Sequence, residues 1–209
     1  MNSAAVFEEG LDVLAARDPD LASVIAAHGR PTFWSRDPGF PALVLIILEQ
    51  QVSLASARAA FNRLVENVGV PTPEEFLKLD AETLRSMGFS RQKTRYCRAL
   101  AQDILSGGLD LDGVADLTDE EARSALMTVA GIGRWTADIY LFCALRRPDI
   151  WPVGDLALSV ALQQVKNLPS RPDVDEFERL GELWRPWRSV AAQILWHHYL
   201  GVRQLKVKR

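Results

Sequence analysis

The chain has 209 residues, enough for one large domain or two smaller ones, and with 48% hydrophobic residues it can bury a sizeable core. Its formal net charge of -3 excludes a protein that is basic throughout, although a local basic patch can still bind nucleic acid. The two cysteines, Cys97 and Cys143, are too few for a four-cysteine iron–sulfur or zinc site. Since each lies in an apolar segment, we expect buried, reduced thiols.

Two features of the chain bear on its location. The longest apolar run, residues 41–48, is far too short to cross a membrane. The first ten residues carry acidic side chains where a signal peptide needs positive charge. We therefore expect a cytoplasmic protein with no membrane partner.

The pattern of apolar residues is helical along the chain. Apolar residues recur at spacings of three and four, and no segment alternates as a strand does. Thr72, Ser90, Thr118 and Asp155 stand where helix N-caps are expected, and Glu121 completes a capping box with Thr118. The sequence thus predicts an all-α fold. Among the predicted helices are residues 91–105, 156–164, 173–180 and 189–200.

Proline-bearing breaks at residues 30–41 and 147–152 divide this helical chain. They predict two helical lobes with a cleft between them. One lobe, of a six-helix type, would comprise residues 36–147 and carry the glycine turn described next. The other would comprise residues 1–35 together with residues 148–209.

The segment LMTVAGIGRWTA, residues 126–137, contains a tight glycine turn between two predicted helices. Gly131 and Gly133 bracket Ile132, and glycine lets another backbone come close. Backbone N–H groups at such a turn, where a helix begins, are a ready site for a phosphate. One carboxylate, Asp155, follows in WPVGDLAL. A phosphate site beside a carboxylate suggests chemistry on a nucleic acid; the alternative is an ordinary helix connector followed by an N-cap aspartate.

Basic residues gather in two places. One strip with no acid between its members consists of Arg85, Arg91, Lys93, Arg95 and Arg98, and a second group beside the glycine turn consists of Arg134, Arg146 and Arg147. A run of charge is usually a solvated helix face. These residues lie at junctions between loops and helices, however, which favours contact with phosphates.

Four stretches of the chain resemble a known family. LMTVAGIGRWTA resembles the helix–hairpin–helix of DNA base-excision glycosylases, with Ala130 where a proline is usual, and Asp155 falls where that superfamily keeps its catalytic aspartate. Three more, ILEQQVSLASA, GFSRQKTRYCRALA and WRPWRSVAAQILW, resemble the branch of bacterial 3-methyladenine DNA glycosylase II. Over roughly residues 35–200, the chain is therefore similar to the HhH-GPD DNA glycosylases.

The resemblance implies a monofunctional enzyme. Bifunctional relatives place a lysine after the second glycine and use it to form a Schiff base, whereas this chain has Trp135 there, and Arg134 stays cationic. The implied reaction is hydrolysis of the N-glycosidic bond of an alkylated purine, of the 3-methyladenine or 7-methylguanine type, flipped out of the duplex. The product would be an abasic site, without lyase cleavage. The implied partner is double-stranded DNA with damaged bases, and we expect a nucleoid-associated monomer.

The resemblance also implies roles for single residues. Asp155 would be catalytic, by stabilising positive charge on the sugar or by activating water; the sequence leaves both open. Trp135 and Trp196 would line the base pocket, with Tyr140 and Trp151 as weaker candidates. The DNA-contacting residues would be Gly131, Ile132, Gly133, Arg134, Thr136, Lys93 and Gln51, of which Gln51 would fill the gap left by the flipped base.

No cofactor is expected to be required, and no iron–sulfur cluster. The backbone carbonyls of Met127, Val129 and Ile132 match positions that hold a structural Na⁺ or K⁺ in the resembling branch, when DNA or salt is present. Two other functions stay open: the same fold acting on uracil, hypoxanthine or ethenoadenine, and a non-catalytic module that binds DNA through the hairpin alone.

Overall fold

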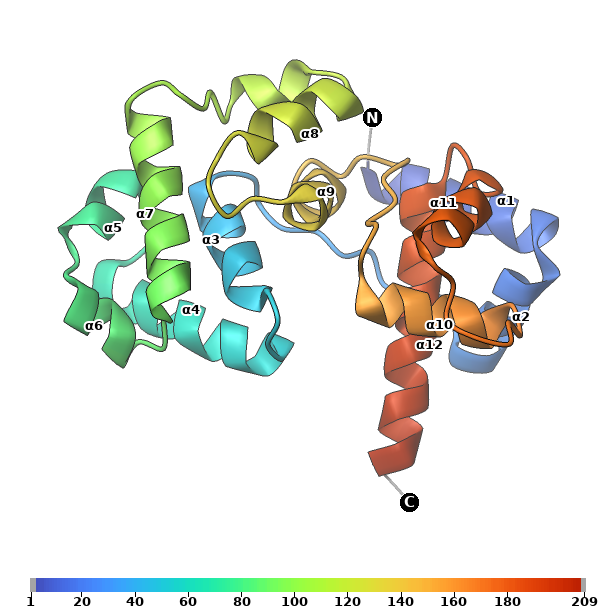
Figure 1. The fold of residues 1–209 in the computed structure, drawn as a ribbon. Coiled ribbons are helices and arrows are strands. Elements are labelled where there is room, and N and C mark those ends of the chain that lie inside the picture. Colours follow the sequence, from blue (N-terminus) through green and yellow to red (C-terminus); the bar gives the residue numbers. More distant parts are fainter. Residues whose placement is uncertain (1–2, 208–209) are drawn as a thin grey trace. The chain divides into compact units, whose positions relative to one another are not determined.

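The computed structural model describes the backbone of residues 3–207 and the side chains of residues 4–203. Within this part of the chain the secondary structure is helical, without a strand, which confirms the predicted all-α fold. In chain order the helices are α1 (Ser3–Arg17), α2 (Pro19–His28), α3 (Phe40–Glu49), α4 (Leu54–Val68), α5 (Pro73–Lys78), α6 (Ala81–Ser86), α7 (Arg91–Leu105), the 3-10 helix η1 (Gly113–Asp116), α8 (Asp119–Met127), α9 (Arg134–Cys143), α10 (Leu156–Val165), α11 (Val174–Glu182) and α12 (Arg188–Val207) (Figure 1).

The chain divides into two compact units, residues 36–145 and residues 1–35 with 146–209. The first division falls inside the predicted break at 30–41, and the second lies just before the one at 147–152. The hairpin unit, as we call residues 36–145, contains seven α helices, α3 to α9, where a six-helix type was predicted. The aspartate unit, which contains Asp155, holds α1, α2 and α10 to α12. The cleft between the lobes stays a prediction.

The core of the hairpin unit is built around α3. Its sequence FPALVLIILE is apolar nearly all round, and each residue from Ala42 to Leu48 is buried. A helix that is hydrophobic on all sides is stable only where neighbours cover it. Here α4, α7 and α9 pack against α3, and α5 and α6 pack on α7 (Figure 1). Because α8 in turn packs on α9, the glycine turn between α8 and α9 is attached to this core.

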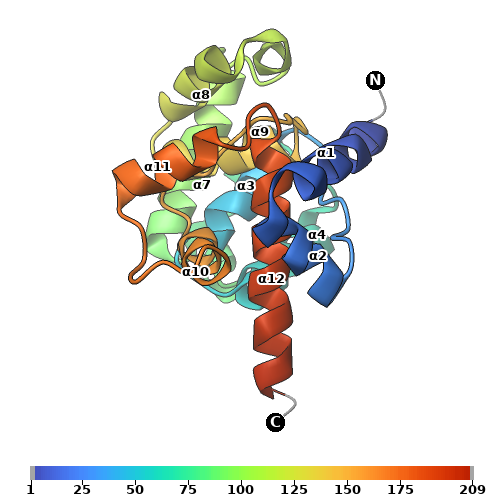
Figure 2. The ribbon, with the colours of Figure 1, turned by 90° about the vertical axis from the view of Figure 1, so that its right-hand side faces the viewer.

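The aspartate unit joins segments from both ends of the chain, since α12 packs against α1, α2 and α10 (Figure 2). Asp18, the N-cap of α2, ties these segments together. Its Oδ2 accepts hydrogen bonds from Trp184 Nε1 at 2.7 Å and from Lys166 Nζ at 2.8 Å. Burial by itself raises the pKa of Asp18, but the hydrogen bonds from Lys166 and Trp184 outweigh it and lower the pKa below its ordinary value.

Local capping chemistry sets most helix starts. Thr72, Ser90 and Asp155 each accept a hydrogen bond from the backbone N–H three residues further on, and Thr118 and Glu121 form the predicted capping box. The side-chain oxygen satisfies an N–H that has no partner inside the helix. These predicted N-caps are therefore confirmed.

The predicted end of α12, at residue 200, is wrong, because the helix continues to Val207. Glycine usually marks a helix end, yet Gly201 lies inside this one. A Cβ at Gly201 would stand 2.7 Å from Nδ1 of His28 on α2. The glycine therefore makes room for a side chain of the packed neighbour, at the cost of about 1 kcal/mol that glycine carries inside a helix.

Both cysteines are free and buried, as predicted. Burial raises the pKa of the Cys143 thiol to about 11 and raises that of Cys97 further. Separately, no helix among the described residues is long and apolar enough to span a membrane.

Candidate functional site

The glycine turn between α8 and α9 depends on Gly131 for its shape. The φ of Gly131 is +94°, in the region that residues with a Cβ avoid. A Cβ at this position would also overlap the ring of Tyr96, which approaches from α7. The fold alone therefore explains this glycine.

Gly133, the N-cap of α9, has no such structural reason to be glycine. Its φ of -90° and ψ of 178° are open to any residue, and a Cβ there would meet nothing within 4 Å. It is exposed at the positive end of the α9 dipole. Because Gly133 has no side chain, a ligand can approach its backbone closely. Close approach is a reason for glycine that differs from the positive φ of Gly131.

A side chain that sequence reasoning missed attaches the glycine turn to α3. Gln50 Nε2 donates to the carbonyl of Gly131 at 3.0 Å and to Thr136 Oγ1 at 3.0 Å. Thr136 is buried and its hydroxyl accepts from Gln50, and its predicted contact with DNA stays a prediction. Ile132 is also buried, which leaves its backbone for any contact with DNA.

An ion pair joins the two helices of the hairpin. Arg123 on α8 donates from Nε to Oδ1 of Asp138 on α9 at 2.6 Å, and Asp138 is fully buried. Burial raises the pKa of Asp138, against the opposing effect of Arg123. Arg134, in the first turn of α9, is exposed, with its Nε 3.8 Å from Asp138 Oδ2. The side chain of Arg134 is therefore at the surface, where the predicted contact with a phosphate would need it.

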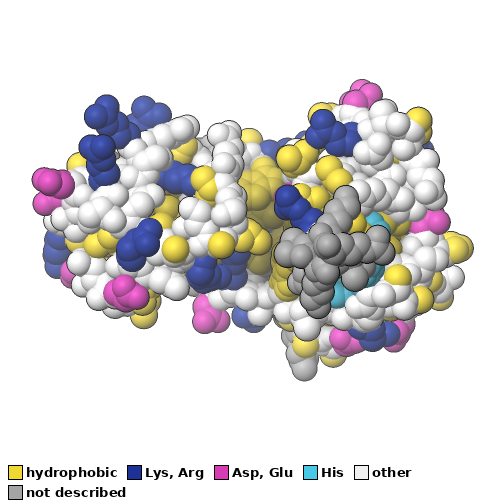
Figure 3. All heavy atoms as spheres, turned by 90° about the horizontal axis from the view of Figure 1, so that it is seen from below, with side chains coloured by type: hydrophobic (Ala, Val, Ile, Leu, Met, Phe, Trp, Pro, Cys, Tyr) yellow, Lys and Arg dark blue, Asp and Glu magenta, His cyan; other side chains and the backbone are white. Residues whose placement is uncertain are grey.

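The predicted basic strip is partly structural. Lys93 Nζ donates to the carbonyl of Leu48 near the end of α3, and Arg98 donates to the carbonyl of Leu79. Burial lowers the pKa of Lys93. The other three members are exposed: Arg85, Arg91 and Arg95. Figure 3 shows Lys and Arg side chains spread over the displayed face of the hairpin unit, with fewer Asp and Glu. Lys93 thus supports α3 directly, and its contact with DNA stays a prediction.

Gln51, the predicted wedge, lies in the turn after α3. It is exposed, and its φ is +57°, an uncommon conformation for a residue with a Cβ. Backbone strain of this kind occurs most at functional sites. Val52 and Leu54 beside it are also exposed, although both are apolar. The geometry suits a residue that enters a duplex, and the wedge role stays a prediction.

Asp155 is the N-cap of α10, as predicted. Its Oδ1 accepts from the backbone N–H of Leu158 at 2.8 Å and from Trp196 Nε1 on α12 at 3.2 Å. Two donors from two helices therefore fix the orientation of one half-buried carboxylate.

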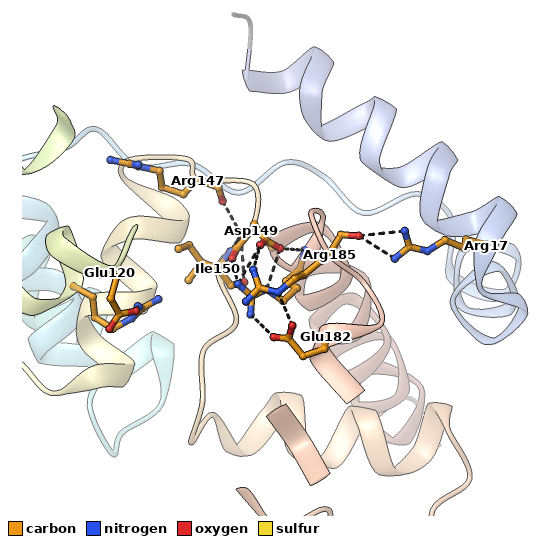
Figure 4. Close-up of polar contacts among 10 residues, drawn as sticks. Arg17, Glu120, Arg147, Asp149, Ile150, Glu182 and Arg185 are labelled. Carbon is orange, nitrogen blue, oxygen red and sulfur yellow. Dashed lines mark hydrogen bonds and ion pairs between the residues drawn. The ribbon is translucent and has the colours of Figure 1, made fainter. Parts of the chain in front are cut away.

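The loop that leads to Asp155 is anchored to the start of α12 (Figure 4). Asp149 forms ion pairs with Arg185 at 2.6 Å and with Arg188 at 2.9 Å. Ser189 Oγ accepts from the N–H of Ile150 at 2.9 Å and donates to the carbonyl of Arg147. Arg185, Arg188 and Ser189 of the WRPWRS stretch thus hold this loop in place.

Trp196, a predicted pocket residue, already has an aromatic neighbour. The ring of Trp34 stacks on it with centroids 5.6 Å apart and an interplanar angle of 14°. Trp196 is only 7% exposed, whereas Trp34 is 38% exposed. Gln193 on α12, with its amide oriented to satisfy both neighbours, accepts from the N–H of Trp34 and donates to the carbonyl of Thr32. Sequence reasoning missed Trp34, because nothing local marks it.

The two weaker pocket candidates, Tyr140 and Trp151, are both buried. Tyr140 is 1% exposed, and its hydroxyl accepts a hydrogen bond from the N–H of Gly39, the N-cap of α3. Trp151 is 4% exposed, stacks on Phe177 and donates from Nε1 to the carbonyl of that residue. Both rings are buried in the cores of their own units, and their pocket roles stay predictions. Trp135 is half-buried in the first turn of α9, and its pocket role stays a prediction.

Among the described residues, no group of three or more His, Cys, Asp or Glu side chains could hold a metal ion. The functional features are instead a glycine turn open at Gly133, and a carboxylate held by a helix start and an indole. The exposed N-terminus of helix α9 suits the binding of a phosphate. A carboxylate held in a fixed orientation suits the stabilisation of a positive charge that develops during a reaction.

Comparison with known proteins identifies this combination. Residues 44–186 match the model of the HhH-GPD superfamily of base excision DNA repair proteins. The match spans well over half of the chain, so the chain belongs to this family.

Individual relatives agree with that assignment. DNA-3-methyladenine glycosylase 1 of Schizosaccharomyces pombe is 34% identical over 158 residues, which cover 74% of this chain and 69% of the relative. DNA-3-methyladenine glycosylase 2 of Escherichia coli is 27% identical over 165 residues, which cover 74% of this chain and 55% of the relative. A solved structure of an S. pombe 3-methyladenine DNA glycosylase with abasic DNA has a TM-score of 0.83 and 29% identity, covering 90% of this chain and 95% of that one. The predicted family resemblance is confirmed.

Proposed function

We propose that this protein is a monofunctional DNA glycosylase of base excision repair. It hydrolyses the N-glycosidic bond of alkylated purines in double-stranded DNA and leaves an abasic site. The observation that carries the proposal is Asp155, a carboxylate fixed by α10 and by Trp196 in a chain of the HhH-GPD family. The similarity to relatives named 3-methyladenine glycosylases supports the alkylated purine as substrate.

The chemistry follows from the charge that develops during the reaction. A base inside a duplex is out of reach, so the enzyme must first flip it out. Departure of the base leaves positive charge on the sugar ring, which the carboxylate of Asp155 stabilises. A methyl group on a purine ring nitrogen makes the base cationic and a good leaving group. Little acid catalysis is therefore needed, which fits a site with one carboxylate.

The glycine turn supplies the grip on DNA. Backbone N–H groups around Gly133 hold a phosphate at the positive end of α9, and exposed Arg134 adds a cationic contact. The carbonyls of Met127, Val129 and Ile132 lie at or just after the end of α8, where helix carbonyls lack partners within the helix, and that of Val129 also accepts from the N–H of Ile132 at 3.1 Å. That arrangement suits a structural Na⁺ or K⁺ when DNA or salt is present.

The proposed reaction stops at base removal. Trp135 stands where a lyase has its Schiff-base lysine, and Arg134 beside it cannot act as a neutral amine. Borohydride reduction in the presence of DNA that contains an abasic site should therefore trap no covalent adduct. A strong adduct would mean that the enzyme is bifunctional.

Asp155→Asn tests the catalytic role directly. Asparagine caps helices as well as aspartate does, so the variant keeps the start of α10 and removes only the charge. We expect the rate of 7-methylguanine release from methylated duplex DNA to fall by about 10²- to 10³-fold, with DNA affinity retained. Asp173→Asn makes the same change at the N-cap of α11, and it should leave the rate unchanged. Unaltered release by Asp155→Asn would refute the assignment.

The lesion class is best read from the products. Mass spectrometry of bases released from alkylated DNA should detect 3-methyladenine and 7-methylguanine. Release of only uracil, hypoxanthine or ethenoadenine from matching substrates would keep the fold and change the substrate. A protein that binds DNA and releases no base would be the non-catalytic module.

A further inference from the structure

Two tryptophans of the aspartate unit, Trp34 and Trp196, form a stacked pair next to Asp155. Trp196 donates to Asp155 Oδ1 from one edge and carries the ring of Trp34 on one face. The pair spans distant parts of the sequence, the segment between α2 and α3 and the middle of α12. The question is which of the two indoles meets a base.

The spacing of the rings answers this. A base inserted between two parallel rings needs about 7 Å, twice a contact of about 3.5 Å. The ring centroids are 5.6 Å apart and the planes are nearly parallel, so no base fits between them. Trp196 is also nearly fully buried, whereas the outer part of Trp34 is at the surface. Of the two indoles, Trp34 is the one with surface to offer to a ligand.

The placement of Trp34 is built into the fold. Buried Gln193 bonds to the backbone on both sides of Phe33, at Thr32 and Trp34. The Phe33 ring in turn packs on Phe7 of α1, with centroids 5.2 Å apart. An exposed indole leaves apolar surface in contact with water and so forgoes the free energy that its burial would contribute. The fold therefore holds an indole next to the carboxylate with part of its surface exposed, where a ligand can contact it.

We propose that Trp34 is the aromatic surface on which the flipped purine stacks, and that Trp196 is a positioning residue that orients Asp155. This inference rests on the proposed glycosylase function. An indole face attracts a cation, so Trp34 favours purines that alkylation has made cationic. The role predicted for Trp196, contact with the base, thereby passes to its exposed neighbour.

The test compares two properties of the purified full-length chain. The first is the single-turnover rate of 7-methylguanine release from a duplex oligonucleotide. The second is affinity for the same duplex with an abasic site, which has no base to stack. For Trp34→Ala we expect the rate to fall by about 5- to 100-fold, the usual range for a lost base–aromatic stack, with unchanged abasic-site affinity. Trp34→Phe should restore most of the rate, and Trp34→Leu, which is apolar without a π face, should not.

Two further variants separate the roles. Trp196→Phe keeps a ring and removes the N–H that Asp155 accepts, so the rate should fall while the abasic-site affinity holds. Trp187→Phe changes a half-buried tryptophan of the same unit that packs on Gly10, and it should alter neither property. Thermal denaturation of each variant checks that it is folded.

The outcomes distinguish this inference from the proposed function. If the wild-type chain releases no alkylated base, the glycosylase function itself is wrong. If the wild-type chain is active and Trp34→Ala keeps its full rate, the stacking role is wrong while the function stands. A faster Trp34→Ala would also overturn it, because Trp34 would then cover the site. An equal loss of rate and abasic-site affinity would make Trp34 merely structural.

Discussion

At the scale of single residues, positions 131 and 133 of the turn are glycine for different physical reasons. Gly131 is required by its positive φ and by the ring of Tyr96, both of which belong to the fold. Gly133 has an ordinary conformation and open space around it. The sequence motif GIG contains both and does not tell them apart.

Matched alanine substitutions should separate these reasons. Gly131→Ala should lower the free energy of unfolding by about 2–4 kcal/mol, since it combines left-handed strain with overlap on Tyr96. Gly133→Ala should change that free energy by less than about 1 kcal/mol, and it should weaken binding to DNA because a methyl group stands between phosphate and backbone. Urea denaturation and a DNA titration measure the two effects. Equal destabilisation by both would contradict this division.

At the scale of elements, the hairpin is held on α3 by an amide. Gln50 follows the last residue of α3 and bonds to Gly131 in the turn and to Thr136 in the first turn of α9. Its neighbour Gln51 is exposed and bonds to neither. The two adjacent glutamines of EQQV thus point in different directions, Gln50 inward and Gln51 outward. The reason is that α3 ends here and the chain changes direction.

Substitution of these adjacent glutamines should have opposite consequences. Gln50→Ala removes two hydrogen bonds and leaves the buried Thr136 hydroxyl without this partner, so stability should fall by about 1–3 kcal/mol. Gln51→Ala should keep stability and relieve the strain of a left-handed residue only slightly, yet it should slow base release if Gln51 is the wedge. Denaturation curves and single-turnover rates report the two effects. A stable Gln50→Ala protein with normal activity would refute the anchoring role.

At the scale of the whole molecule, the aspartate unit depends on a charge pair that links residues 1–35 to residues 146–209. Asp18 on one segment meets Lys166 and Trp184 on the other. The lowered pKa of Asp18 means that the folded protein binds this proton less readily than the unfolded chain does. The stabilisation is therefore complete above the ordinary pKa of about 4 and is lost as the pH falls through the lower folded value.

Acid denaturation should reveal this pair. Asp18→Asn keeps the oxygen that caps α2, removes the charge and replaces the oxygen that accepts from Trp184 by an NH2 group, so stability at pH 7 should fall by about 1–3 kcal/mol. Between pH 4 and pH 2 the variant should lose less further stability than the wild-type chain does. Asp20→Asn, which also faces Lys166 but is half exposed, should have a smaller effect at pH 7. Parallel pH profiles for Asp18→Asn and the wild-type chain would show that the pair does not titrate as described.

The sequence by itself determined the helices, the glycine turn and the place of Asp155. These depend on local chemistry, namely capping at Ser90 or Thr118, periodic apolar residues and glycine next to a helix start, all of which act within a few positions. The tertiary structure alone decided which side chains face the core and which remain exposed. Tyr140 and Trp151 are aromatic residues near motif positions, yet contacts with segments distant in the chain bury them. The same kind of contact brings Trp34 onto Trp196 and Gln50 onto Gly131. Burial and stacking arise from chain segments that meet only after folding, so no local pattern records them.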